Sequence, residues 1–329
     1  MKVLIIGAGG FAGGYLIKEL TACGYEVHAT HLQSEEINFD CFKHILDVLD
    51  KENVKKLINE INPDIIYHLS AQSSVAVSWK KPQLTTEINV IGSINVMEAL
   101  PDNSRLILIG SGEEYGFIRE NACPIKETEN LNPANIYAVS KVCAEMIGKI
   151  YHRAYNKDII MVRAFNHSGA GQAETFVISD FCKQIAEIEL NLKSPEIYTG
   201  NLSAKRDFTD VRDIVRAYRL LGKKGISGKV YNIGRGKAVS IEDILNIAIG
   251  FSEVPIVHKL DPKRLRASDI PIIEPDVSEI FADTGWKAEI SIQETVLSTL
   301  DYWREKLKRK DFEELCNRLK DKFCQNSLT

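Results

Sequence analysis

The segment KVLIIGAGGFAGGYLIKEL, residues 2–20, determines the fold class of this chain. Val3–Ile6 is a continuous apolar run, as expected for a strand that is buried on both faces of a parallel sheet. Apolar residues then repeat at helical spacing from Leu16 to Leu20. Three glycines lie between the two patterns: Gly7, Gly10 and Gly13. The segment therefore predicts a strand, a tight glycine turn and a helix.

The glycine turn has the features of a dinucleotide site. Its first two glycines permit a tight turn and close approach of the backbone to a pyrophosphate at the N-terminus of the helix. The last glycine permits contact between helix and strand. We therefore predict cofactor contacts from Gly7, Gly10, Phe11, Ala12 and Gly13.

Apolar strand patterns alternate with helical patterns through the first half of the chain. The strand candidates are Val3–Ile6, Val27–Thr30, a short stretch near Leu46–Val48, Ile65–Leu69, Leu106–Ile109 and Ile159–Phe165. Helical patterns lie between them, for example Lys51–Ile61 and Gln83–Leu100. This alternation predicts an α/β fold with a Rossmann-type, doubly wound parallel sheet. Ligands of such sheets bind beyond the carboxyl ends of the strands, where the glycine turn, Leu69-Ser70-Ala71, Ser111 and Asn166 fall.

The pattern changes after Phe165, where the segments become irregular and richer in glycine. We predict an NAD(P)-binding Rossmann domain from residues 1–165 plus about 206–235. Residues 166–205 and 236–329 would form a smaller C-terminal substrate-binding domain. The chain is charged from Trp303 onward, with leucines spaced as on a helix, which predicts a terminal helix that either docks on the chain or binds a partner.

Composition indicates an ordinary globular chain. Of its 329 residues, 44% are hydrophobic and 26% are charged, and the net charge of −4 gives no general attraction to nucleic acid or to an anionic membrane. There is no apolar run near 18 residues and no signal segment, so a cytoplasmic enzyme is expected. The seven cysteines are scattered without a Cys-x-x-Cys, which predicts reduced thiols and no metal site.

A second motif carries the chemistry. Ser111 opens the stretch Ser-Gly-Glu-Glu-Tyr-Gly, and Tyr137-Ala-Val-Ser-Lys141 follows 21 residues after Gly116. Tyr137 and Lys141 are four residues apart, so they lie on the same face of a helix. We expect the ammonium to lower the pKa of the phenol, which favours proton exchange with an alcohol or sugar oxygen that Ser111 also bonds. A Tyr-x-x-x-Lys on its own is also common on structural helices.

These motifs resemble the extended short-chain dehydrogenase/reductase family, over the chain up to about residue 305. The matching segments are Gly7-x-x-Gly10-x-x-Gly13, His68-Leu-Ser-Ala-Gln72, Ser111, Tyr137-x-x-x-Lys141 and Arg163-Ala-Phe-Asn-His167. Within that family the chain is most similar to the GDP-sugar branch, on three longer segments: residues 163–172, 200–213 and 264–269. It resembles the GDP-4-keto-6-deoxy-mannose reductases, and the GDP-mannose 4,6-dehydratases are close cousins.

The resemblance favours the reductases within this branch. The string Arg-Asp-Phe-Thr-Asp-Val-Arg-Asp, residues 206–213, is similar to theirs. The dehydratases have an arginine pair after an Asn-His-Glu, where this chain has His167-Ser-Gly-Ala-Gly. Glu113 stands where the dehydratases keep a catalytic glutamate, but reductases of this branch can hold one there too.

The resemblance implies a reaction and the roles of its residues. Tyr137 would donate a proton to the C4 oxygen of a GDP-4-keto-6-deoxy-mannose as hydride arrives at C4. Lys141 would tune Tyr137 and bond the nicotinamide ribose, and Ser111 would polarise the carbonyl. The alternatives are a GDP-mannose 4,6-dehydratase using Glu113, a nucleotide-sugar 4-epimerase, and a nucleotide-binding protein without turnover.

The resemblance also implies the binding residues. Asp47 and Val48 would contact the adenine, and the cofactor would also touch Leu69, Ser70 and Ala71. Arginine suits a diphosphate because its planar donors match phosphate oxygens. The substrate would be held by Asn166, Asn201, Lys205, Arg206, Arg266 and Asp269. Ala267 replaces a proline that is usual before this last Ser-Asp pair. Homodimers form in similar proteins through the helices of residues 83–100 and 137–151.

The cofactor type is read at the end of the second strand, which runs His28-Ala-Thr-His-Leu-Gln33. NAD enzymes usually place an acid there for the ribose hydroxyl, whereas NADP enzymes avoid it. No acid follows until Glu35, so we predict NADP, with NAD possible. His31 is the candidate partner of the additional phosphate.

Overall fold

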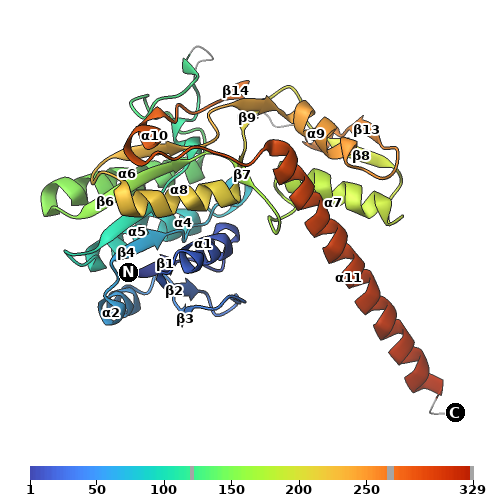
Figure 1. Ribbon diagram of the computed structural model, residues 1–329, viewed down its shortest axis with the longest axis horizontal. Coiled ribbons are helices and arrows are strands. Elements are labelled where there is room, and N and C mark those ends of the chain that lie inside the picture. The colour runs from blue at the N-terminus through green and yellow to red at the C-terminus, as the bar shows by residue number, and fades with distance from the viewer. Residues whose placement is uncertain (119–121, 265–269, 327–329) are drawn as a thin grey trace. The chain divides into compact units, whose positions relative to one another are not determined.

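The computed structural model describes residues 1–118, 122–264 and 270–326 (Figure 1). The chain divides into two compact units. Unit 1 comprises Met1–His167, Lys205–Ala238 and Ile270–Glu289. Unit 2 comprises Ser168–Ala204, Val239–Asp269 and Ile290–Thr329. Residues 270–289 thus belong to unit 1, whereas the sequence placed them in the second domain.

Unit 1 is built on a seven-stranded sheet with the order β11-β6-β5-β4-β1-β2-β3. All neighbouring strands are parallel. The strands are β1 (Lys2–Ile6), β2 (Glu26–His31), β3 (Phe42–Ile45), β4 (Ile65–His68), β5 (Arg105–Ile109), β6 (Asp158–Ala164) and β11 (Val230–Ile233). The predicted Rossmann-type sheet is confirmed, and its strand order reverses between β1 and β4, the position at which such sheets bind ligands.

The third strand was placed wrongly. It spans Phe42–Ile45 rather than Leu46–Val48. Leu46 and Val48 are buried and pack into the core after the strand has ended, which explains their apolar pattern. The strand itself lies at the edge of the sheet and is largely exposed, so it carries little apolar signal.

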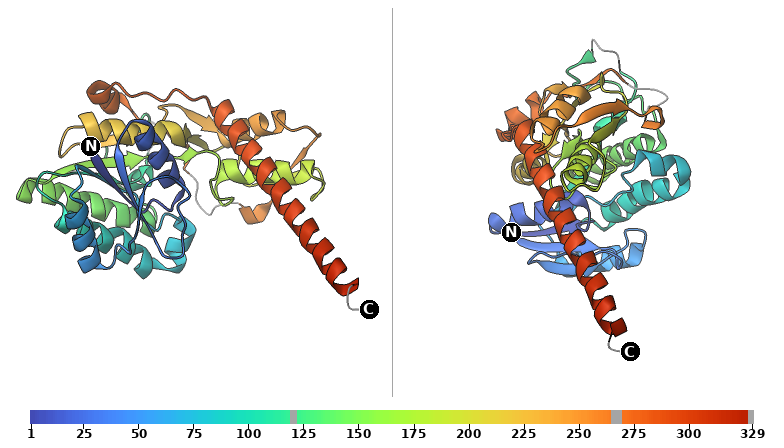
Figure 2. Two further views of the ribbon diagram at one scale, coloured as in Figure 1. Left: turned by 60° about the horizontal axis from the view of Figure 1, so that its bottom comes forward. Right: turned by 90° about the vertical axis from the view of Figure 1, so that its right-hand side faces the viewer.

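Helices cover both faces of the sheet, as the two views of Figure 2 show. Val3 and Ile5 face one hydrophobic core, whereas Leu4 and Ile6 face the other, because successive side chains of a strand alternate. The first core includes α1 (Phe11–Ala22) and α8 (Val211–Lys224). The second core is covered by α2 (Lys51–Ile61), α5 (Gly92–Ala99) and α6 (Ile136–Tyr155).

The predicted helix over residues 83–100 is divided into three parts. They are α4 (Pro82–Thr86), the π-helical η1 (Glu87–Ile91) and α5. A further short helix, α3 (Val75–Lys80), precedes them. π-helical turns occur frequently at functional sites. The buried Asn89 of this turn connects it to α6, as described below.

Short elements complete unit 1 and its junctions with unit 2. They are η2 (Gly112–Tyr115), β7 (His167–Ser168), β9 (Lys205–Asp207), β10 (Thr209–Asp210), β12 (Ala238–Ser240), β14 (Ile272–Ile273) and α10 (Ser278–Thr284). β14 pairs with β9, which brings the segment after residue 270 onto unit 1. Trp286 of the same segment is buried, and its indole N–H donates to the carbonyl of Asp213 at 3.0 Å.

The described part of unit 2 contains three α-helices, one short 3-10 helix and a two-stranded parallel sheet. Its elements are α7 (Val177–Glu189), β8 (Glu196–Thr199), α9 (Ile241–Gly250), β13 (Val257–Leu260), η4 (Pro262–Arg264) and α11 (Ile292–Asn326). The predicted terminal helix is confirmed as part of α11, which packs on α7. The indole of Trp303 donates to Ser179, and Arg304 pairs with Glu189. Within the described ranges, no helix has the length and apolar character that a membrane span requires.

Candidate functional site

The glycine turn after β1 requires its first glycine. Gly7 has a φ of +84°, which side-chain-bearing residues rarely adopt. A Cβ at this position would lie 2.6 Å from the backbone of Ser70, which follows β4. The Gly7 amide donates to Thr30 Oγ1 at 3.0 Å, so the turn is also fixed to β2. The sequence therefore folds into a turn whose backbone is fixed at the reversal point of the sheet.

The helix after this turn offers an anion site. α1 begins after Gly10, and no side chain in the described part of the chain caps it. The first N–H groups of a helix have no partner within the helix, and together with the helix dipole they attract an anion. Gly10 has space around it, because the nearest atom to an added Cβ lies 3.6 Å away. The turn thus fits the pyrophosphate of a dinucleotide.

The other predicted cofactor residues lie at the ends of β2, β3 and β4. Leu69 and Ser70 both donate their amides to the Ile6 carbonyl at 2.9 Å. Asp47 is exposed and accepts the Leu49 amide at 2.9 Å, and Val48 is buried. His31 is partly exposed, and its Nδ1 bonds the Leu32 carbonyl at 2.8 Å. Because these strands are parallel, their carboxyl ends lie on the same side of the sheet. His31, Asp47, Val48, Leu69 and Ser70 therefore all lie on that side.

Glu35 also reaches this edge, which the sequence did not indicate. Its Oε2 accepts the Leu32 amide at 3.0 Å. The same carboxylate lies against Gly9, where an added Cβ would overlap it. An acid therefore lies beside the glycine turn although none stands at the end of β2. Only tertiary folding of the loop after β2 reveals this contact.

Ser111, Tyr137 and Lys141 come together beyond β5. Ser111 lies two residues after the end of the strand, and Tyr137 and Lys141 lie in the first turns of α6. All three side chains are buried, with at most 8% of their surface exposed. Tyr137 hydrogen-bonds Ser111, and the ammonium of Lys141 donates to the Ile109 carbonyl at 2.8 Å. The start of α6 is fixed by Asn135, whose side chain caps the helix by accepting the Ala138 amide at 2.8 Å.

The expected lowering of the Tyr137 pKa is wrong in direction. Burial raises the pKa of Tyr137 to about 12, and the nearby Glu114 and Glu113 act in the same direction, whereas the hydrogen bond from Ser111 lowers it. Burial also lowers the pKa of Lys141 to about 8. Desolvation disfavours the charged form of both groups. Tyr137 therefore retains its proton at neutral pH, as a proton donor must.

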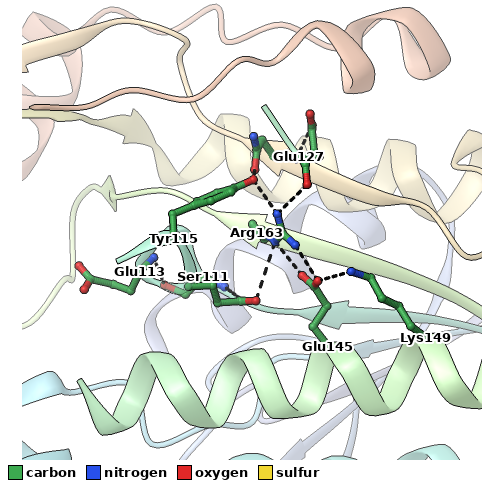
Figure 3. A network of polar contacts seen from close by, with 9 residues as sticks. Ser111, Glu113, Tyr115, Glu127, Glu145, Lys149 and Arg163 are labelled. Atoms are coloured by element: carbon green, nitrogen blue, oxygen red, sulfur yellow. Dashed lines mark hydrogen bonds and ion pairs between the residues drawn. The ribbon is translucent and has the colours of Figure 1, made fainter. Parts of the chain in front are cut away.

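Glu113 lies at the margin of this site. Its amide donates to Ser111 Oγ at 3.2 Å, and its carboxylate accepts the side-chain amide of Asn135 at 3.2 Å. In Figure 3 its side chain points away from Arg163. Glu113 thus contacts both the serine and the cap of the helix that carries Tyr137.

A buried ion pair lies behind the site (Figure 3). Arg163 on β6 donates to both carboxylate oxygens of Glu145 on α6, at 2.8 and 2.7 Å, and to the Tyr115 hydroxyl at 2.8 Å. Lys149 also donates to Glu145 at 2.6 Å. Although burial acts to raise it, the hydrogen bonds and charge of Arg163 hold the pKa of Glu145 below its ordinary value. The sequence motif contained Arg163 but gave no sign of Glu145 or of the neighbouring Glu114.

A second buried network fixes the backbone of Tyr137. The Asn89 side chain of η1 donates to Ser140 Oγ at 2.9 Å, and Ser140 donates to the Tyr137 carbonyl at 2.7 Å. His68 is bonded to Ser93 Oγ at 3.0 Å. Burial lowers the pKa of His68 to about 3, so its ring is neutral. These polar residues stand within apolar patterns, and the sequence alone did not identify their role.

The predicted substrate residues are distributed between the two units. Asn166 is exposed after β6, and its carbonyl accepts the Thr209 amide at 3.0 Å. Lys205 is exposed on β9, and Arg206 beside it donates to the Ile270 carbonyl at 2.6 Å. Asn201 belongs to unit 2, where its side chain accepts the Ser203 amide at 3.0 Å. Two predicted residues lie outside the described residues: Arg266 and Asp269.

The described residues contain no group of three or more His, Cys, Asp or Glu side chains that could hold a metal ion. The acid-base residues of the site are thus a phenol, an ammonium and carboxyls. A site with this chemistry beside a dinucleotide turn suits hydride transfer coupled to proton transfer.

The family model of GDP-mannose 4,6-dehydratase matches residues 4–299. The chain belongs to this family. The predicted membership of the GDP-sugar branch of the extended short-chain dehydrogenases/reductases is therefore confirmed. GDP-6-deoxy-D-mannose reductase of Pseudomonas aeruginosa is 31% identical over 268 residues, which cover 80% of this chain and 88% of that protein. GDP-mannose 4,6-dehydratase of Yersinia enterocolitica is 28% identical over 89% of this chain and 91% of that protein.

Solved structures of this fold cover nearly the whole chain. RMD from Pseudomonas aeruginosa, solved in complex with NADPH, has a TM-score of 0.84 at 28% identity and covers 93% of this chain and 99% of its own. UDP-glucose 4-epimerase from Thermotoga maritima, solved with UDP-glucose, has a TM-score of 0.83 at 26% identity and covers 93% and 100%. The family thus includes relatives named as reductase and dehydratase, and the fold extends to epimerases.

Proposed function

We propose that this chain is a nicotinamide-dependent reductase of a GDP-4-keto-6-deoxy-mannose, which forms a GDP-6-deoxyhexose of the GDP-D-rhamnose type. The observation that carries the proposal is the buried Tyr137, bonded to Ser111 and protonated at neutral pH. A ketone reductase needs such a donor, because the alkoxide formed at C4 must take up a proton. The similarity to the Pseudomonas aeruginosa reductase supports the choice of substrate.

Each residue of the proposed reaction has a defined task. The bound nicotinamide supplies hydride to C4. Ser111 donates to the C4 oxygen and orients it, and Tyr137 transfers its proton to the same oxygen. The ammonium of Lys141, held by the Ile109 carbonyl, stabilises the phenolate that remains. The burial of all three groups excludes water and strengthens these interactions.

We propose NADP as the cofactor, with NAD possible. The pyrophosphate would lie on the turn of Gly7, Gly10, Phe11, Ala12 and Gly13, and the adenine near Asp47 and Val48. The NADPH complex of RMD supports NADP. The carboxylate of Glu35, which lies against Gly9, supports NAD because it can accept a ribose hydroxyl.

We propose that Arg206 and Asn166 of unit 1 hold the diphosphate, together with Arg266. Arg206 already directs its guanidinium to the backbone of residue 270. Lys205 is exposed on the same strand and would add a positive charge. Asn201 and Asp269 are the further residues that we propose for binding the nucleotide.

A 4,6-dehydratase is the second candidate, and Glu113 is the observation that favours it. Its carboxylate lies beside Ser111 and Asn135, where it could take a proton from sugar C5 and assist the loss of water. In that reaction the phenol must first accept a proton from the C4 hydroxyl. The 31% identity to the Pseudomonas aeruginosa reductase, against 28% to the Yersinia enterocolitica dehydratase, favours the reductase.

The experiment that separates the two candidates uses purified protein with each substrate. With GDP-4-keto-6-deoxy-mannose and NADPH, a reductase lowers the absorbance of the reduced nicotinamide, and Tyr137→Phe should stop the decrease. Tyr155→Phe is the matched control, since Tyr155 is an exposed residue of the same helix. Dehydration of GDP-mannose without net loss of cofactor would instead establish the dehydratase.

We also propose a homodimer formed through α6. Val139, Met146 and Ile150 are each 45–52% exposed, and their spacing places them on one side of the helix. Ile91 at the end of η1 is also exposed. Burial of such a stripe against a second copy would remove apolar surface from water. Light scattering should report a dimer for the wild type and a monomer for Met146→Lys, with Ile226→Lys, another exposed position, as the control.

We propose a cytoplasmic location. The thiols of Cys23, Cys41, Cys143 and Cys182 are free, which suits a reducing compartment. Fractionation of cells that produce the tagged chain tests this location. Recovery with an extracytoplasmic marker would contradict it.

A further inference from the structure

Glu114 is a fully buried acid that the proposed reaction does not use. It lies in η2, and its side chain is 0% exposed. One carboxyl oxygen, Oε1, accepts the backbone N–H of Ser111 at 2.7 Å. The other, Oε2, lies 3.9 Å from Arg163 Nε and has no hydrogen-bond partner among the described residues.

This placement is energetically unfavourable for a carboxyl group. Burial, followed by the charge of Glu145, raises the pKa of Glu114 to about 8. Buried ionisable groups contribute little net stability compared with apolar residues of similar volume. With Ser111, Glu114 also completes a capping box at the start of η2, a local contact that a glutamine would serve equally well. The capping box explains an acceptor here, but not an ionisable group that is fully buried.

The contacts of Glu114 lead directly to the reacting groups. Its carboxyl holds the Ser111 amide, and a Cβ at Gly110 would overlap Glu114 Oε1 and lie 2.6 Å from the Val162 carbonyl. The backbone immediately before Ser111 is thus enclosed by the carboxyl on one side and β6 on the other. Ser111 in turn bonds Tyr137. A shift of Glu114 would displace the hydroxyl that must meet the C4 oxygen.

We propose that Glu114 is a positioning residue, whose carboxyl holds the Ser111 amide beside the buried Arg163–Glu145 ion pair and so fixes the serine hydroxyl against Tyr137. This contact, the anchor of Ser111, is a property of the fold, but its importance for catalysis rests on the proposed function. The charged and titratable groups that face Glu114 are Glu145 and Lys141 on α6, Arg163 on β6, and Tyr137. Because an ionised carboxylate also accepts an N–H, the anchor persists when Glu114 loses its proton.

Two substitutions separate the anchor from packing. Glu114→Gln keeps an acceptor oxygen for the Ser111 amide, whereas Glu114→Leu fills a similar volume without one. Asp213→Leu is the matched control, since Asp213 is a buried acid of the same unit whose contacts include Arg216 and the Glu289 amide. Thermal unfolding of each variant shows whether it is folded.

Hydrogen exchange at the Ser111 amide tests the anchor without any substrate. We expect faster exchange in the peptide around residue 111 for Glu114→Leu, and wild-type protection for Glu114→Gln and Asp213→Leu. Wild-type protection of this amide in Glu114→Leu would overturn the inference, whether or not the chain is a reductase.

Kinetics test the consequence for catalysis. Glu114→Leu should lower kcat for the 4-keto sugar by up to about 10²-fold, as expected for a misplaced catalytic group, with KM changed less than kcat. Glu114→Gln should restore most of kcat. Both variants should move the alkaline limb of the pH profile to lower pH, because the negative charge of Glu114 helps Lys141 to retain its proton. A wild-type kcat and pH profile in Glu114→Leu would refute the positioning role, whereas no turnover by the wild type would refute only the proposed function.

Discussion

Removal of the charge of Glu145 tests how the buried Arg163–Glu145 ion pair contributes to stability. Arg163 is 2% exposed and Glu145 is 3% exposed, and two hydrogen bonds of 2.8 and 2.7 Å join them. Breaking a buried ion pair by removing one partner costs about 3–5 kcal/mol, because the other charge remains buried. Glu114 changes this expectation, since its carboxyl lies 3.9 Å from the same guanidinium.

We expect Glu114 to replace part of the lost charge in Glu145→Gln. The charge of Glu145 helps to keep Glu114 protonated, so its removal favours ionisation of Glu114 beside Arg163. Glu145→Gln alone should therefore cost only about 2 kcal/mol of unfolding free energy, and Glu114→Gln alone less than about 1 kcal/mol. The double variant leaves Arg163 without a carboxylate and should reach about 3–5 kcal/mol.

The assay is urea unfolding of the wild type, both single variants and the double variant. Unfolding is detected by hydrogen exchange of the β6 amides, so that the measured free energy is that of unit 1. The penalty of Glu145→Gln should be complete at neutral pH and shrink as the pH falls below about 4.5, since a carboxyl with a lowered pKa stabilises the fold only while it is ionised. If the unfolding free energy lost in the double variant equalled the sum of the losses in the two single variants, Glu114 would not replace the charge of Glu145. Glu98→Gln, which removes an exposed ion pair with Lys51, is the control and should cause no measurable loss.

Three further substitutions test the site itself. Tyr137→Phe should lower kcat by roughly 10²–10⁴-fold through loss of the proton donor, measured in steady-state reduction of the keto sugar; an unchanged kcat would remove Tyr137 from the mechanism. Arg206→Ala should mainly raise KM for the GDP-sugar, because a diphosphate contact is made equally in ground and transition states; calorimetry showing wild-type affinity would contradict its assignment. Glu35→Gln should raise kcat/KM with NADPH relative to NADH, because a carboxylate beside Gly9 repels an additional phosphate; an unchanged ratio would place the ribose elsewhere.

The parts of the fold that depend on local sequence could be predicted. The glycine turn, the parallel strands and the Tyr137–Lys141 pair are each defined by residues within a few positions of one another. β3 could not be placed correctly, because the edge strand is exposed while Leu46 and Val48 after it are buried. An apolar sequence pattern indicates burial. In this segment the buried residues are not the residues that pair as a strand.

The parts of the site that depend on tertiary contacts could not be predicted. The approach of Glu35 to Gly9 follows from the path of the loop after β2. The approach of Glu114 to Arg163 joins residues on η2 and β6, whereas the contact of Glu114 with Ser111 is a local capping box. The pKa of Tyr137 is raised chiefly by burial, which depends on how the whole unit packs around the phenol.

The most direct test of the reductase follows the hydride itself. Reduced cofactor that carries deuterium on the transferred position of the nicotinamide is incubated with the protein and GDP-4-keto-6-deoxy-mannose, and the sugar product is analysed by NMR and mass spectrometry. We expect a GDP-6-deoxyhexose with deuterium at C4 and one equivalent of oxidised cofactor. An unlabelled product, or dehydration of GDP-mannose with no net consumption of cofactor, would contradict it.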